Sequence, residues 1–318
     1  MNDFIDSHMH VFQTKEQTAM ATMLGDTEYD GTLDSVLAAI KKAGLSKGVI
    51  VGQIPVAYMM EAGLAKLSDE LSDKERKKAE QELRLKMICR IQRRNAWICE
   101  LGKQHTELVP LITLDPIMGP DLMKQEITDK VLNHGAKGIK LHPPIGRYYP
   151  NDPAMWPAYE TCVELDIPIL FHCGVHPAFE GRALVPKPVL YSTPKYFEDV
   201  IGNFPKLTVQ LAHMGIAPDH RFPETFPILY EESMSLAKKC PSVYFDTSTI
   251  LHSTFSGKEM KDWLPMIHEI GAERILFGTD FPSIDPAVDI KKWQESTLSE
   301  KEKKLILGEN ARRVYKIP

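Results

Sequence analysis

Short apolar runs recur along the chain and are separated by stretches with helical periodicity. Eight of these runs are rich in β-branched and aliphatic residues, at positions 4–6, 48–51, 108–112, 138–141, 167–171, 207–211, 243–246 and 275–278. Continuous runs of this kind are typical of strands that are buried on both faces, as in a parallel sheet. Amphipathic stretches such as 33–43 and 155–165 lie between them. Because strand and helix alternate in eight units, the pattern predicts an α/β fold, a (β/α)₈ TIM barrel.

The spacing between the predicted strands is uneven. Residues 55–103 are too many for one crossover helix, and they comprise a highly charged part, 66–84, followed by a more apolar part, 87–101. We expect this segment to form a helical insertion after the second strand, a hairpin that lies over the barrel mouth. Residues 174–205 contain five prolines and residues 215–227 contain three. This composition predicts long irregular loops after the fifth and sixth strands.

The composition narrows the class of protein. The 318 residues suit a single barrel domain over 1–318, and their net charge of −5 lacks the basic surplus that nucleic-acid binding requires. No apolar stretch approaches the roughly 20 residues of a membrane span, and the chain starts directly with the strand at 4–6, which predicts no signal peptide. The five cysteines are widely spaced and form no CxxC pair. We therefore expect reduced thiols in a cytoplasmic protein.

Histidines and an aspartate stand at the ends of the predicted strands. His8 and His10 follow the first strand, and their imidazoles point the same way because alternate residues of a strand share a face. Similar side chains follow the fourth, fifth, sixth and eighth strands: His142, His172, His213 and Asp280. In a TIM barrel these ends share the face that holds the active site. Each residue alone has an ordinary structural alternative, as a strand-end, core or capping residue, but their common position favours a metal site.

Six short motifs follow one another along the chain: IDSHMH at 5–10, IKLHP at 139–143, LFHCG at 170–174, AHMG at 212–215, FGTDFP at 277–282 and GENARRVY at 308–315. Together they resemble the amidohydrolase-related family often called amidohydrolase 2, over essentially the whole chain. That family contains metal-dependent hydrolases. It also contains decarboxylases similar to aminocarboxymuconate-semialdehyde decarboxylase and γ-resorcylate decarboxylase.

The resemblance implies roles for the strand-end residues. One divalent ion, zinc as the first choice and manganese as the second, would be bound by four side chains: His8, His10, His172 and Asp280. His213 would lie beside the water that the ion activates and would act as an acid or base, and Asp280 would share in proton transfer. Imidazole and carboxylate suit such ions, which lower the pKa of water from 15.7 towards about 7. Asp6 completes the Asp-x-His-x-His pattern without a clear role of its own.

Further residues on the same face are candidates for substrate binding. His142 follows the fourth strand, and the loops at this face add three guanidinium groups and two imidazoles: Arg147, His176, Arg182, His220 and Arg221. A guanidinium can bind a substrate carboxylate through two hydrogen bonds. Lys140, within the fourth strand, is open between an unmodified side chain and a carbamylated one that bridges two metal ions.

Three hypotheses for function follow. The first is a metal-dependent hydrolase that activates water to attack an ester, lactone or amide carbonyl of a small organic acid. The second is a metal-dependent non-oxidative decarboxylase, which needs the same ligands and which an arginine near the metal would favour. The third is an inert barrel used as a binding module, against which the intact ligand positions argue. We expect a small carboxylate-bearing substrate and no nucleic-acid or membrane partner, with a homodimer left open.

Overall fold

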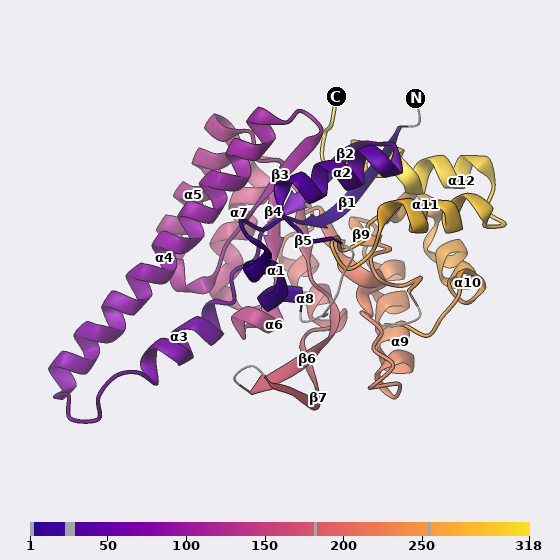
Figure 1. Cartoon of the computed structure of the whole chain (residues 1–318). Coiled ribbons are helices and arrows are strands. Elements are labelled where there is room, and N and C mark those ends of the chain that lie inside the picture. The colour runs from indigo at the N-terminus through magenta and orange to yellow at the C-terminus, as the bar shows by residue number, and fades with distance from the viewer. Residues whose placement is uncertain (1–2, 23–28, 181–182, 253–255) are drawn as a thin grey trace.

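Eight parallel strands form one sheet in the computed structural model, which describes residues 3–22, 29–180, 183–252 and 256–318 (Figure 1). Their order in the sheet is β1-β2-β3-β4-β5-β8-β9-β10. Their bounds are β1 Phe4–His10, β2 Leu45–Val51, β3 Leu108–Thr113, β4 Gly138–Leu141, β5 Ile169–Phe171, β8 Val209–Leu211, β9 Val243–Asp246 and β10 Ile275–Leu276. Each strand coincides with one of the predicted apolar runs, and the predicted TIM barrel is confirmed.

The barrel closes between β1 and the chain around the end of β10. Ser7 N donates a hydrogen bond to Phe277 O over 2.8 Å, and His10 N donates to Phe281 O over 2.7 Å. A further parallel bridge joins Met9 to Phe281. These contacts pair the first strand with the last, so the sheet is continuous around the barrel.

The register of β1 against β2 is irregular between Asp6 and Met9. Ile5 belongs to the apolar cluster inside the barrel, whereas Met9 packs into the layer between strands and helices. Simple alternation would put both residues on the same side, so the irregularity turns the strand just before its end. As a result, His8 and His10 both face the group of polar side chains at the barrel mouth.

A layer of helices packs around the sheet, while α13 Asn310–Val314 lies at its bottom. The other helices are α1 Lys15–Thr22, α2 Leu33–Ala43, α5 Pro120–His134, α7 Trp156–Glu164, α8 Lys195–Asn203, α9 Thr225–Lys239, α10 Met260–Ile270, α11 Pro286–Glu295 and α12 Glu300–Lys304. α2 illustrates how the sequence forms this layer. Val36, Ala39 and Ile40 make its buried face, and Gly44 ends it with a φ of 67°, which glycine adopts without strain. None of the described helices combines the length and the apolar character of a membrane span.

The helical insertion after β2 is confirmed, and its two helices, which are very unequal in length, pack against each other as a hairpin. α3 (Val56–Leu64) is followed by α4 (Asp73–Gln104), one helix of 32 residues. The second half of α4 packs against β3 and α5 and is itself the crossover helix. The charged first half and α3 project from the barrel as an arm, and α3 touches α6 (Pro143–Gly146) beside the mouth (Figure 1). The segment therefore lies beside the barrel mouth. We had expected it to lie over the mouth.

The expectation of an irregular loop is wrong for most of residues 174–205. β6 (Gly174–Glu180) and β7 (Ala183–Ser192) form an antiparallel hairpin, and α8 follows it. Three prolines within these strands obscure the alternation that would have predicted them. The hairpin lies at the end of the barrel where α6 also lies (Figure 1). It places His176 of β6 near the rings of His142 and His172.

The C-terminal segment covers the opposite end of the barrel, where the strands begin. Four of its side chains join the apolar cluster inside the barrel: Ala311, Val314, Tyr315 and Ile317. The Arg312 guanidinium also binds the carboxylate of Asp3, just before β1. The chain thus closes the bottom of the barrel with its own last helix and leaves the mouth to the strand-end residues.

Candidate metal centre

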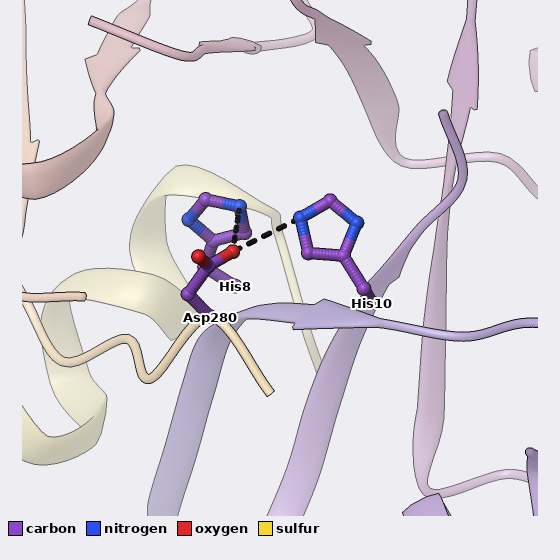
Figure 2. A group of neighbouring side chains, drawn as sticks. All are labelled: His8, His10 and Asp280. Atoms are coloured by element: carbon purple, nitrogen blue, oxygen red, sulfur yellow. Dashed lines mark ion pairs between the residues drawn. The ribbon is translucent and has the colours of Figure 1, made fainter. Parts of the chain in front are cut away.

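Three of the strand-end residues form a compact group at the barrel mouth. The Nε2 atoms of His8 and His10 lie 3.5 and 3.0 Å from Oδ1 of Asp280, and Figure 2 shows both imidazoles beside this carboxylate. One ligand atom from each residue lies within 4.8 Å of the other two. His8 is completely buried, whereas the Asp280 side chain keeps 23% of its surface exposed. The group is therefore accessible on the side of the carboxylate.

Asp280 is held in place by its backbone and by Asp6. The φ of Asp280 is 60°, a left-handed conformation that is uncommon outside glycine. Asp6 accepts hydrogen bonds from the hydroxyl and the amide of Thr279 and from the amide of His8. Burial raises the pKa of Asp6 to about 8 in spite of these hydrogen bonds. The structure thus assigns Asp6 the role that the sequence left open: it ties β1 to the loop that carries Asp280.

Asp246, the last residue of β9, fixes the tautomer of His8. Its Oδ2 lies 3.2 Å from His8 Nδ1, and its Oδ1 accepts from the backbone amides of His213 and Ser248. Burial alone would raise the pKa of Asp246, but its interactions with His8, His213 and Ser248 hold that pKa well below its usual value. The ionised carboxylate accepts the Nδ1 proton of His8. The lone pair on His8 Nε2 is then available to a metal ion.

His213 lies next to His8 on the other side of the site. Its ring centroid is 5.6 Å from that of His8 and 5.0 Å from that of His172. His213 Nδ1 lies 3.1 Å from Ser248 O and 2.8 Å from Ser248 Oγ. The backbone is left-handed at His213 and again at Met214, with φ of 59° and 56°. Strained residues of this kind tend to cluster at functional sites.

His172 lies outside the compact group of three ligands. Its ring stacks on His142 at a centroid distance of 4.2 Å and meets the ring of His176 at 5.5 Å. His172 Nε2 and His142 Nδ1 are buried, and neither has a hydrogen-bond partner within the described part of the chain. Such nitrogens cost free energy unless a ligand satisfies them. The structure therefore brings three of the four predicted metal ligands together and places the fourth in an adjoining cluster of imidazoles.

The side chain of Lys140, on β4, reaches the metal-ligand group beside His8. Its ammonium lies 3.0 Å from His8 Nε2, and the residue is only 1% exposed. Burial lowers the pKa of Lys140 to about 8. The amine is therefore mostly protonated at neutral pH, and it adds a buried positive charge beside the imidazoles.

The predicted substrate-binding residues are more widely spread. His142 and His176 adjoin the site, with ring centroids 5.1 Å apart. Arg147 binds Glu61 of α3 over 2.9 Å, and its guanidinium lies over the ring of Tyr58. This arginine thus joins the mouth to the arm formed by α3 and the first half of α4.

Two other predicted substrate-binding residues lie together on a loop. His220 and Arg221 are exposed in the loop that precedes α9. Arg221 binds the carboxylate of Asp219 through several hydrogen bonds, so its charge already has a partner. Arg182 lies outside the described residues.

Three residues near the site were missed by sequence reasoning: Asp246, Ser248 and Gln210. Asp246 could have been found, because it ends the predicted seventh strand in the same way that Asp280 follows the eighth. Gln210 carries no such signal, since it stands in the middle of β8. Ser248 follows β9 in a turn, where serine is common for local reasons.

The donor set fits one divalent metal ion. Imidazole nitrogen and carboxylate oxygen are suitable ligands for zinc or manganese. Burial would raise the pKa of Asp280, but His10 and His8 hold it well below its usual value, so the carboxylate is ionised. His172 Nε2, buried nearby without a partner among the described residues, offers a fourth donor.

The metal-free protein is expected to lose stability as the pH falls from about 6.5 to 4. Burial lowers the pKa of His8 and of His176 to about 4, whereas histidine in an unfolded chain titrates near 6.5. In this window the unfolded chain binds protons that the folded chain does not. Each of these histidines should then lower the free energy of unfolding by about 1.4 kcal/mol per pH unit, and Asp6, whose pKa is raised to about 8 in the folded chain, should offset the share of one histidine.

Urea unfolding between pH 7.5 and 4 measures this effect. His176→Gln should reduce the slope by about one proton, whereas the same change at His268, which is 55% exposed on α10, should not. A free energy of unfolding that is constant over this range would contradict the prediction.

Several known proteins resemble this chain. A γ-resorcylate decarboxylase from Polaromonas sp. strain JS666 is 28% identical over 259 residues, which are 71% of this chain and 76% of that protein. The structure of 2,6-dihydroxybenzoate decarboxylase from Rhizobium matches with a TM-score of 0.70 at 18% identity, over 100% of this chain and 99% of the other. A dihydroxybenzoic acid decarboxylase from Polaromonas sp. JS666, solved with manganese and 2-nitroresorcinol, matches with a TM-score of 0.67 at 19% identity, over 100% and 98%. At these identities the structural matches show the shared fold.

The family itself is shown by the sequence. The family model described as amidohydrolase matches residues 5–317, nearly the whole chain. That range includes every strand-end residue discussed above. The resemblance seen in the motifs is confirmed, and this chain belongs to the amidohydrolase family.

Proposed function

We propose that this protein is a metal-dependent, non-oxidative decarboxylase of a small hydroxylated aromatic carboxylic acid. The metal dependence rests on the group of His8, His10 and Asp280, whose carboxylate is 23% exposed at the mouth of the barrel, and the choice of decarboxylation rests on the similar proteins. These three residues, with His172, would hold one divalent ion. Manganese takes precedence over zinc, because manganese is bound in the similar dihydroxybenzoic acid decarboxylase.

This proposal reverses the order of the first two sequence hypotheses. A hydrolase and a decarboxylase use the same ligands, so the ligand set does not distinguish them. The similar proteins named above are decarboxylases, which favours the second hypothesis. An arginine near the metal would have favoured decarboxylation, but among the described residues Arg147 and Arg221 have carboxylate partners, and the cation next to His8 is the buried Lys140.

Decarboxylation breaks the bond between a ring carbon and the carboxylate, and the electron pair left on that carbon takes up a proton. A bound divalent ion would withdraw negative charge from the oxygens of the substrate. Lys140 would balance part of the same charge. Asp280 is ionised and partly exposed, so it is placed to accept a phenolic proton and to pass it to the ring carbon, after which the phenolate regains a proton from water. His213, whose ring lies next to that of His8, would share in this transfer as a second acid or base.

His142 and His176, which lie beside the proposed metal ligand His172, would bind the aromatic ring. His142 and His172 stack with an interplanar angle of 9°, and His176 meets both rings edge-on. The pKa of His142 lies well below its usual value, mainly because the ring is buried and also because other histidines lie beside it. Its ring is therefore neutral. Flat neutral faces of this kind suit an aromatic substrate.

The protein, stripped of metal and reloaded with Mn²⁺, is expected to convert 2,6-dihydroxybenzoate or a related hydroxybenzoate into CO₂ and the corresponding phenol. Equal amounts of both products should form, because one carbon–carbon bond is broken in each turnover. CO₂ and phenol are measured together over a panel that also contains esters, lactones and amides of small acids. The metal-free protein is the control. Hydrolysis of a panel member without any decarboxylation would reject this function and restore the first hypothesis.

A further inference from the structure

A chain of buried hydrogen bonds joins the C-terminal segment to the metal-ligand group. The hydroxyl of Tyr315 donates to Gln210 Oε1 over 2.5 Å, and Gln210 Nε2 donates to Asp246 Oδ2 over 2.8 Å. The same oxygen of Asp246 lies 3.2 Å from His8 Nδ1. None of these four residues is more than 1% exposed. The chain crosses the interior of the barrel, from the bottom that the last helix closes to the mouth.

The direction of each hydrogen bond follows from the chemistry of its groups. Asp246 is ionised and can only accept, so the groups that face its Oδ2 are donors. Gln210 must therefore turn its NH₂ toward Asp246, which points its oxygen toward the barrel bottom, where the Tyr315 hydroxyl donates to it. The second proton of this NH₂ faces Ser7 Oγ at 3.2 Å. A flipped amide would place its oxygen against the carboxylate.

We propose that Tyr315 is a positioning residue for the metal site and acts through Gln210 and Asp246 on the orientation of His8. Without the tyrosine hydroxyl, Gln210 Oε1 is buried with no donor, and the amide is held only at its NH₂ end, so it can shift relative to Asp246. Asp246 then loses a fixed donor, and the imidazole that depends on Asp246 is less firmly held. The segment that closes the bottom of the barrel thereby helps to set the metal affinity at its mouth. This inference rests on the proposed function, since it requires a divalent ion at His8, His10 and Asp280.

The test compares Mn²⁺ binding by the full-length wild type, Tyr315→Phe and Tyr159→Phe. Free Mn²⁺ is followed by its electron paramagnetic resonance signal during titration of the metal-stripped proteins. Tyr159 is the matched control: it is fully buried on α7, and its hydroxyl donates to Pro150 O over 2.6 Å. We expect Tyr315→Phe to weaken Mn²⁺ binding by about tenfold, the lower end for groups that orient metal ligands, and Tyr159→Phe to leave it within about twofold.

A second variant separates positioning from a general loss of stability. In Gln210→Met the link is already broken, so adding Tyr315→Phe should weaken Mn²⁺ binding no further. Equal weakening by Tyr315→Phe in both backgrounds, or equal weakening by Tyr315→Phe and Tyr159→Phe, would overturn the inference. If Tyr315→Phe does not fold, Gln210→Met alone decides, and unchanged affinity in that variant also overturns it. A wild type that binds no Mn²⁺ would refute the proposed metal site before any variant is compared, so the two failures can be told apart.

Discussion

His10→Ala is expected to remove nearly all bound Mn²⁺ from the protein. The change deletes one of the two imidazole nitrogens that face Oδ1 of Asp280, at a distance of 3.0 Å. Residues that only orient a metal ligand typically contribute about 10–100-fold in affinity, so the loss of a direct ligand should exceed about 100-fold. Metal content after dialysis, measured by mass spectrometry, checks the result. Decarboxylation by this variant should fall to the level of the metal-free wild type.

His268→Ala is the matched control for that experiment. His268 is also a histidine, but it lies on α10 with 55% of its side chain exposed. The His268→Ala variant should therefore bind as much Mn²⁺ as the wild type. Full occupancy in His10→Ala would refute the ligand set, and equal loss from both variants would show that histidine substitutions disturb the protein in general.

His213→Asn is expected to lower the rate of decarboxylation by about 10²–10⁴-fold, the range for loss of a general acid or base. Asparagine is suited to the position because it tolerates the left-handed backbone found there, with a φ of 59°. The backbone amide of residue 213 keeps its hydrogen bond to Asp246. Folding and metal content should therefore be retained. The measurement is kcat at saturating Mn²⁺ as a function of pH, and the profile of the variant should lack one limb.

Two other outcomes at His213 would change its assignment. An unchanged rate would make its imidazole a structural group that supports Ser248 and the turn after β9. Loss of Mn²⁺ on the same substitution would make His213 a metal ligand, and the set of ligands would have to be redrawn.

The barrel was predictable because its strands are buried on both faces. The run at 138–141 illustrates this: it became β4, Gly138–Leu141, without any shift of its ends, and even its one charged residue, Lys140, is buried. The hairpin of β6 and β7 escaped prediction because its prolines interrupt the alternation of side chains. The continuity of α4 was not predicted either, because the charged half and the apolar half of this one long helix look like two separate elements in the sequence.

The site was predictable to the extent that it depends on strand ends. His8, His10 and Asp280 were placed together because parallel strands end at one face of a barrel. Their approach within contact distance also depends on the register irregularity between Asp6 and Met9, which no pattern in the sequence reveals. The position of His172 against His142 is likewise a matter of side-chain packing.

The interior hydrogen bonds were beyond sequence reasoning for another reason. Tyr315 and Gln210 are 105 positions apart, and they meet only because the last helix enters the bottom of the barrel. Each belongs to or lies close to one of the family motifs, but nothing in those motifs indicates that the two side chains meet. Their pairing follows from the need of each buried polar group for a partner, which becomes visible once the fold is known.

Anomalous diffraction at the manganese edge, from crystals of the protein grown with Mn²⁺, tests the metal centre most directly. We predict one peak in contact with Nε2 of His8, Nε2 of His10 and the carboxylate of Asp280, with His172 Nε2 turned to it as the fourth protein ligand. The absence of a peak at this position, with Mn²⁺ bound elsewhere or not at all, would contradict the account.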